Sequence, residues 1–214
     1  MTEQKQILLD IKMPYKTFVW NLIKMTIMWS SVCFTTYLLH FQLKYLEGDM
    51  FTNNKFCAIT DLMAAFFGCQ IYKIFGLKKT YYLSLSLGVI GGLGVLYLES
   101  MHSEQQISSA QFIFFSKWMP ICIGIAKFGI AISFLASYFA SFIDNRIFPI
   151  EKRATAIGVC NICARSLTGL SPIISELQEP LPMVYFVALL FIALICNSTI
   201  NLEEPNQTKN KKSN

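Results

Sequence analysis

Long runs of apolar residues, separated by short polar segments, cover most of this chain. Six such runs occupy residues 18–41, 56–75, 81–98, 118–142, 154–177 and 181–200. Each is close to the roughly 20 residues that a helix needs to cross about 30 Å of hydrocarbon. Helix is the expected structure, because an open sheet cannot satisfy its backbone in lipid and the strict alternation of a barrel strand is missing. The pattern predicts a short N-terminal segment at 1–17, six membrane helices within 18–200 and a polar, disordered tail at 201–214.

Lysine and arginine are shared unevenly between the polar segments, and every second segment carries most of them. These basic segments contain Lys5, Lys12, Lys16, Lys73, Lys78, Lys79, Arg146, Lys152, Arg153, Lys209, Lys211 and Lys212. The alternate segments contain only Lys44, Lys55 and Lys117. Because loops rich in positive charge stay in the cytoplasm, this asymmetry predicts a multi-pass protein with both termini cytoplasmic.

The composition agrees with a membrane protein. Hydrophobic residues make up 54% of the 214 residues and charged residues only 14%, against about 25% charged in a soluble domain. The basic residues are scattered between apolar runs, so we expect a lipid bilayer and no nucleic acid as the partner. Cys160 and Cys163 form a C-x-x-C inside a predicted helix, with no second pair and no nearby histidine. We therefore expect no disulfide framework, metal or cofactor.

Three ionisable residues, Asp61, Lys127 and Arg165, lie inside otherwise apolar runs. A charge near mid-bilayer costs at least ~2.5–3.5 kcal/mol, so such residues usually face a protein interior or an aqueous cavity and indicate a solute or proton path. Lys127 and Arg165 lie too deep in their helices for the side chain to reach the interface easily. We expect both to face a cavity. A purely structural ion pair between Asp61 and Lys127 is an equal alternative.

Helical spacing places these charges on stripes with other notable side chains. The stripes are Lys127, Ala131, Phe134 and Tyr138; Asn161, Arg165, Thr168 and Pro172; and Trp29, Cys33, Thr36 and His40, with Tyr37 adjoining. A cavity lined by them would offer cations and aromatic faces to an organic ion. His40 lies near the outer edge and is expected to be solvated. A further stripe of small residues, Ser84, Gly88 and Gly92, with Gly91 and Gly94 beside it, predicts close helix packing.

Several of these residues occur in motifs that resemble one branch of a known family. Asp61-Leu-Met-Ala, Gly68 and Gly76-Leu-Lys78-Lys79 look like the eighth helix and following loop of the organic cation/anion transporters in the major facilitator superfamily. Ala126-Lys127-Phe128 with Phe134 and Tyr138 is similar to their tenth helix, and Phe148-Pro149, Lys152-Arg153 and Gly158 to the start of their eleventh. Cys163-Ala-Arg165 through Ser171-Pro172 resembles the eleventh helix of the anion-type members. Lys73, Leu77 and Ala65 depart from the family pattern.

The resemblance implies an all-α membrane protein whose residues 18–200 form a six-helix lobe, helices seven to twelve of a twelve-helix major facilitator fold. Such a lobe would transport small organic ions by alternating access, together with a missing N-terminal lobe or a second half-transporter. It is not an enzyme, and the plasma membrane is the family's usual location. The alternative is a truncated or regulatory membrane protein that does not transport.

The resemblance also implies residue roles. Arg165 would bind an anionic group, because cation-type members carry an acidic residue at this position, so an organic anion or zwitterion is favoured as the solute. Lys127 would assist Arg165 or pair with Asp61. Phe134, Tyr37 and Trp29 would receive the apolar part of the solute. Gly76, Lys78 and Lys79 would belong to a cytoplasmic loop that takes part in the conformational change.

Overall fold

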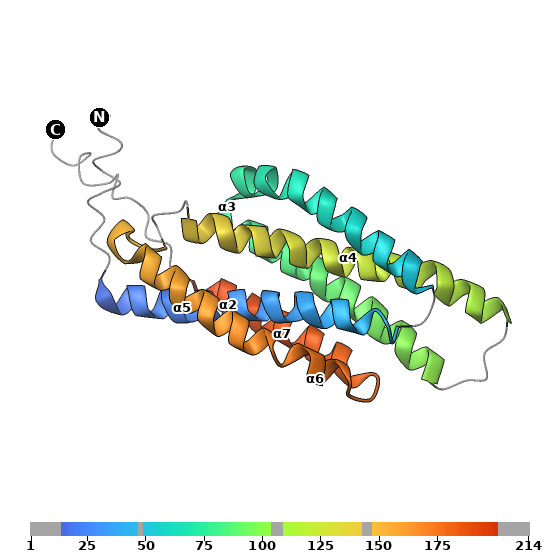
Figure 1. Cartoon of the computed structure of the whole chain (residues 1–214). Helices are drawn as coiled ribbons and strands as arrows, with labels where there is room; N and C mark the ends of the chain where they lie inside the picture. The colour runs from blue at the N-terminus through green and yellow to red at the C-terminus, as the bar shows by residue number, and fades with distance from the viewer. Residues whose placement is uncertain (1–13, 47–48, 104–108, 143–146, 201–214) are drawn as a thin grey trace.

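The computed structural model describes residues 14–46, 49–103, 109–142 and 147–200, and nearly all of these are helical (Figure 1). The helices are α2 (Tyr15–Gln42), α3 (Met50–Ser103), α4 (Ser109–Phe142), α5 (Ile150–Thr168), α6 (Ser171–Ser175) and α7 (Leu181–Thr199). Five helical segments are long and apolar enough to cross a membrane. The predicted all-α class is therefore confirmed, and the fold fits an integral membrane protein. The predicted tail at 201–214 and most of the segment at 1–17 lie outside the described residues.

Helix α3 is two helices that meet at Gly76, whose backbone is not helical (φ 71°, ψ 177°). Its first arm covers residues 50–75 and its second arm 77–103. Contacts with α4 pair Thr60 with Gly124 and Gly68 with Leu135 in the first arm, but Gly94 with Cys122 and Ser84 with Ser133 in the second. The first arm thus runs parallel to α4 and the second antiparallel, so the chain reverses direction at Gly76 (Figure 1).

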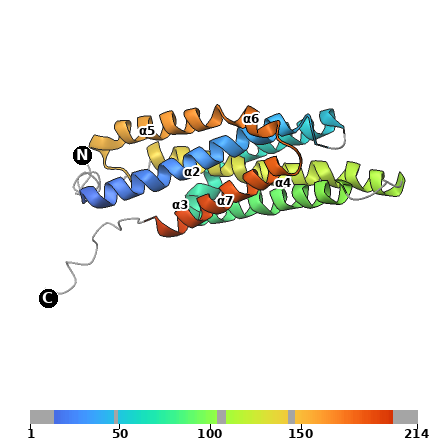
Figure 2. The ribbon, with the colours of Figure 1, turned by 90° about the horizontal axis from the view of Figure 1, so that it is seen from below.

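The polar segments that are rich in Lys and Arg lie at one end of the bundle. The start of α2, the reversal in α3, the start of α5 and the end of α7 lie there in both views (Figures 1 and 2). Two hydrogen bonds connect these segments, from Lys24 Nζ to the Thr199 carbonyl and from Asn197 Nδ2 to the Lys78 carbonyl (3.1 Å). A third, from Arg153 Nη1 to the Phe142 carbonyl (2.9 Å), connects the start of α5 to the end of α4. Within the described residues, the basic segments therefore share one end of the bundle.

The second arm of α3 packs very closely on α4, and glycine makes this possible. A Cβ atom on Gly91 would lie 2.3 Å from the Ala126 backbone nitrogen, and one on Gly129 would lie 2.4 Å from the Ser84 carbonyl oxygen. Hydroxyl groups bridge the same interface, since Ser84 Oγ and Ser133 Oγ are 2.7 Å apart. The predicted packing role of the small residues is confirmed, and the two helices form a fixed wall of the bundle.

Large apolar side chains cover the outside of the bundle. Phe66, Ile162 and Ile195 are 68%, 69% and 65% exposed, and many other Phe, Ile and Leu residues are exposed as well. Soluble monomers rarely display such extensive apolar surface. This surface is suited to contact with lipid acyl chains.

Candidate functional site

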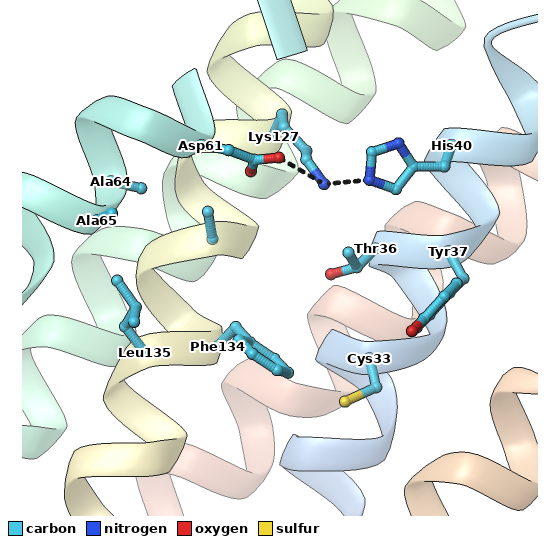
Figure 3. A pocket seen from close by; sticks show the side chains of 11 residues that line it. Cys33, Thr36, Tyr37, His40, Asp61, Ala64, Ala65, Lys127, Phe134 and Leu135 are labelled. Carbon is cyan, nitrogen blue, oxygen red and sulfur yellow. Dashed lines mark hydrogen bonds and ion pairs between the residues drawn. The ribbon is translucent and has the colours of Figure 1, made fainter. Parts of the chain in front are cut away.

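A cavity of about 370 Å³ lies between α2, the first arm of α3 and α4 (Figure 3). It is lined by Cys33, Thr36, Tyr37 and His40 of α2, Asp61, Ala64 and Ala65 of α3, and Lys127, Ala131, Phe134 and Leu135 of α4. One side of the cavity is apolar and aromatic, and three ionisable groups lie together on the other (Figure 3). This combination of an apolar wall with a few convergent polar groups is typical of small-molecule sites.

Lys127 is the most deeply buried charge in the cavity, with only 2% of the residue exposed. Its Nζ lies 2.8 Å from His40 Nε2 and 3.5 Å from Asp61 Oδ2. An ammonium group has donors and no acceptor, so Lys127 donates to His40 Nε2, and the neutral ring carries its proton on Nδ1. The Asp61 side chain is 44% exposed and faces the cavity, so solvent shares in balancing its charge.

The aromatic side of the cavity is built mainly from Phe134 and Tyr37. The Phe134 ring packs on Tyr138 with centroids 5.1 Å apart, which holds it against the cavity. The nearby Thr36 hydroxyl donates to the Val32 carbonyl at 2.8 Å, so its donor is already occupied within α2. Phe134 and Tyr37 therefore present ring surface, and the Tyr37 hydroxyl is available to a neighbouring helix.

Arg165 reaches the cavity through Tyr37. It lies in the last turn of α5, is exposed, and donates from Nη1 to the Tyr37 hydroxyl oxygen at 3.1 Å. Arg165 is not itself among the residues that line the cavity. The structure thus places Lys127 in the lining of the cavity and Arg165 at its margin, in contact with the lining residue Tyr37.

Trp29 lies away from the cavity, although it shares a helical stripe with Cys33, Thr36 and His40. It is 1% exposed and packs on the Tyr138 ring with centroids 5.3 Å apart. Tyr138 contacts both the Trp29 ring and the Phe134 ring. The structure therefore places Trp29 in the core, where it supports the aromatic wall from behind and touches no cavity space.

The other predicted residues fall into two places. Gly76, Lys78 and Lys79 lie at the reversal of α3, at the basic end of the bundle, and do not line the cavity. Ala65 does line it, so the first arm contributes a methyl group there. Among the residues that line the cavity, the positive charge of Lys127 therefore comes from α4 and not from α3, and Arg165 of α5 lies at the margin.

His40 makes a contact in the site that the sequence analysis does not predict. Its position near the end of α2 predicts a solvated side chain, and the residue is exposed as expected, but its ring also touches the buried ammonium of Lys127. The available signal is its place on the stripe that also contains Thr36 and Cys33, one turn and two turns earlier. Helical periodicity indicates which face a residue occupies, but it does not say which neighbouring helix brings a charge to that face.

No protein-family model, curated protein or solved structure matches this chain. Among the described residues, no group of three or more His, Cys, Asp or Glu side chains could hold a metal ion. Cys160 and Cys163 are free thiols, and Cys160 Sγ is 3.3 Å from the Thr26 hydroxyl. The interpretation of the site therefore depends on its own geometry.

Proposed function

We propose that this chain is a six-helix lobe of a secondary transporter that carries small organic anions or zwitterions. The observation that carries the proposal is the cavity with the buried ammonium of Lys127 on one side and the Phe134 ring on the other. An intramembrane charge that faces a cavity is a solute-path feature by default. A solute with an anionic group and a ring would satisfy both sides of this cavity.

The charge balance favours an anion over a cation. Lys127 and Arg165 contribute two cations, and Asp61 contributes one carboxylate that is partly solvated. Arginine binds carboxylate and sulfonate groups with paired, charge-assisted hydrogen bonds. Arg165 uses Nη1 for Tyr37 and is exposed, which leaves its other nitrogen donors for an anion. An anion at the margin of the cavity could then contact Arg165 and the Tyr37 ring together.

The fold supports the same proposal at the level of architecture. The two arms of α3 run in opposite directions, and each is long enough for a crossing at 1.5 Å per residue. With the arms counted separately, the described chain has six helices of spanning length, and these fit the C-terminal half of a major facilitator fold. In that architecture the solute binds at mid-membrane between two lobes that rock against each other. A second lobe would then cover the open side of the cavity next to α5.

The proposal is tested by binding two probes that share a ring and differ in charge, benzenesulfonate and benzyltrimethylammonium. The purified chain in lipid nanodiscs should bind the anion and discriminate against the cation. Arg165→Asp should reduce anion affinity by at least about tenfold, and Arg165→Lys should reduce it less, because the charge is kept but the fork is lost. Lys117→Asp, an equal charge reversal on an exposed residue at the start of α4, is the matched control and should bind normally.

Two results would contradict the proposal. If Arg165→Asp binds the anion undiminished per folded molecule, the guanidinium has only a structural role toward Tyr37. If the chain binds neither probe, or prefers the cation, the anion assignment is wrong. A membrane protein that does not transport would then be the better interpretation.

A further inference from the structure

His40 and Lys127 form a contact that can exist in only one protonation state of the imidazole. The ammonium of Lys127 donates to His40 Nε2 at 2.8 Å, so that nitrogen must offer a lone pair. When a proton binds Nε2, both nitrogens become donors and both residues become cations. Proton binding to His40 therefore breaks this hydrogen bond and places a second positive charge at the same wall of the cavity.

The surroundings of His40 leave few other charges to compensate for that proton. The charges that act on its ring are Lys127 of α4 and Asp61 of α3. Arg165 of α5 is bound to Tyr37, one turn earlier on α2, and adds further positive charge on that side. The segments of α6 and α7, which also pack on α2, contain no Asp, Glu, Lys, Arg or His. Among the described residues, Asp61 is then the single carboxylate near the two cations Lys127 and Arg165.

We propose that His40 is a proton-binding site of the cavity and that an organic anion binds together with a proton. This inference rests on the proposed anion-binding function and specifies its second substrate. The proton comes from water and forms an N–H bond at His40 Nε2, while the hydrogen bond from Lys127 is lost. Lys127 keeps its interaction with Asp61, and the anion supplies the negative charge that the protonated ring requires. The cavity then takes up an anion and a proton with no change in net charge.

The inference is tested with benzenesulfonate, which stays ionised across the pH range. The affinity of the purified chain in nanodiscs is measured at pH 7.5 and pH 5.5. We expect affinity to rise by about fivefold or more at the lower pH, since a unit charge is added within a few ångströms of the anion. His40→Gln and His40→Asn should reduce the ratio of the affinity at pH 5.5 to the affinity at pH 7.5 to near one. His102→Gln, which removes the only other histidine of the chain, should keep it.

Asp61 provides the rival explanation, because its protonation would also make the cavity more positive. Asp61→Asn should therefore keep the pH ratio if His40 binds the proton. The inference is overturned if Asp61→Asn abolishes the rise in affinity at low pH, if His40→Gln retains it, or if the wild-type protein binds the probe equally well at both pH values.

A readout without solute separates this inference from the proposed function. In the His102→Gln background, His40 gives the single imidazole signal in ¹⁵N NMR spectra. Removing the neighbouring ammonium with Lys127→Met should shift the midpoint of the His40 titration to higher pH. A shift would support the proton site even if no probe binds at any pH, an outcome that would overturn the anion-binding function alone. An unchanged midpoint would overturn the proton site whatever the probes do.

Discussion

Lys127 is a buried cation whose stability depends on two partners of different strength. His40 accepts a hydrogen bond from it without neutralising its charge, whereas Asp61 supplies the opposite charge from 3.5 Å away. Removing one member of a buried pair costs more than the pair contributes, because an uncompensated charge is left in a low dielectric. Asp61 is therefore the partner whose loss the structure tolerates least.

Asp61→Ala should lower the free energy of unfolding by about 1–3 kcal/mol, since the ammonium of Lys127 loses its counter-charge. Lys127→Met should largely remove that penalty, so the double variant should be destabilised by less than the sum of the single variants. Thermal unfolding in detergent micelles measures all three. Glu176→Ala, which removes an exposed carboxylate, is the control and should be additive with Lys127→Met. If the destabilisations caused by Asp61→Ala and Lys127→Met add up in the double variant, the proposed interaction between Asp61 and Lys127 is contradicted.

At this scale the sequence indicates the charges but not their neighbours. Asp61, Lys127 and Arg165 are identifiable because ionisable residues stand out in an apolar run. The Lys127–His40 contact cannot be identified from the sequence, because it depends on the axial position of α2 relative to α4. Trp29 shows the same limit: its stripe is predicted correctly, but Tyr138 of another helix fills the space in front of it. Neighbouring helices determine which part of a stripe faces open space.

At the scale of helices, the reversal at Gly76 decides how the first arm of α3 reaches the cavity. The apolar runs predict two helices separated by a polar segment at 76–80, whereas helix resumes immediately after one residue. The values φ 71° and ψ 177° belong to a region that is essentially restricted to glycine. Sequence patterns identify the two arms but not the sharpness of the turn, because Lys78, Lys79 and Thr80 look like a loop and are helical.

Gly76→Ala should destabilise the protein by about 1–3 kcal/mol, because a side chain strains this backbone conformation. Steric crowding is not the reason, since a Cβ at Gly76 would meet no atom within 4 Å. Gly158→Ala is the matched control: its Cβ would also meet nothing within 4 Å, but it lies inside the regular helix α5. That variant should be neutral or stabilising by about 0.5–1 kcal/mol. Thermal unfolding that ranks the two variants equally would contradict the assignment of strain to Gly76.

Asp49 caps the start of α3 at the other end of the bundle. Its carboxylate accepts hydrogen bonds from the Thr52 hydroxyl (2.6 Å) and from the backbone N–H groups of Thr52 (3.1 Å) and Phe51 (3.3 Å). The bond from the Thr52 hydroxyl, foremost, holds the pKa of Asp49 below its ordinary value. A lowered pKa means that the cap contributes stability above the ordinary pKa and loses it as pH falls through the folded value.

Asp49→Ala should therefore lower Tm near neutral pH, and the difference from the wild-type protein should shrink below about pH 4. Asp49→Asn keeps a side-chain oxygen acceptor and cannot titrate, so it should retain most of the cap at every pH. Tm measured from pH 3 to pH 7 tests both variants. A Tm difference for Asp49→Ala that persists unchanged at acid pH would show that the ionised carboxylate does not stabilise this helix end.

At the scale of the whole molecule, the distribution of basic residues and the fold agree on which segments lie together. The reversal of α3 and the start of α5 share one end of the bundle, while the start of α4 lies at the other (Figures 1 and 2). The sequence can predict this because the alternation of basic segments repeats along the chain, so no single loop decides it. Such a prediction does not require knowledge of how side chains pack, whereas a prediction of the cavity lining does.

The same asymmetry predicts the orientation in the membrane, and introduced cysteines test it. Lys79→Cys and Lys152→Cys place a thiol at the basic end, and Lys117→Cys places one at the opposite end. Because positively charged segments stay in the cytoplasm, a membrane-impermeant maleimide added to intact cells should label Lys117→Cys alone. All three should react after permeabilisation, and the unsubstituted protein measures the background from its seven native cysteines. Labelling of Lys79→Cys or Lys152→Cys from outside intact cells would contradict the prediction that the basic end of the bundle faces the cytoplasm.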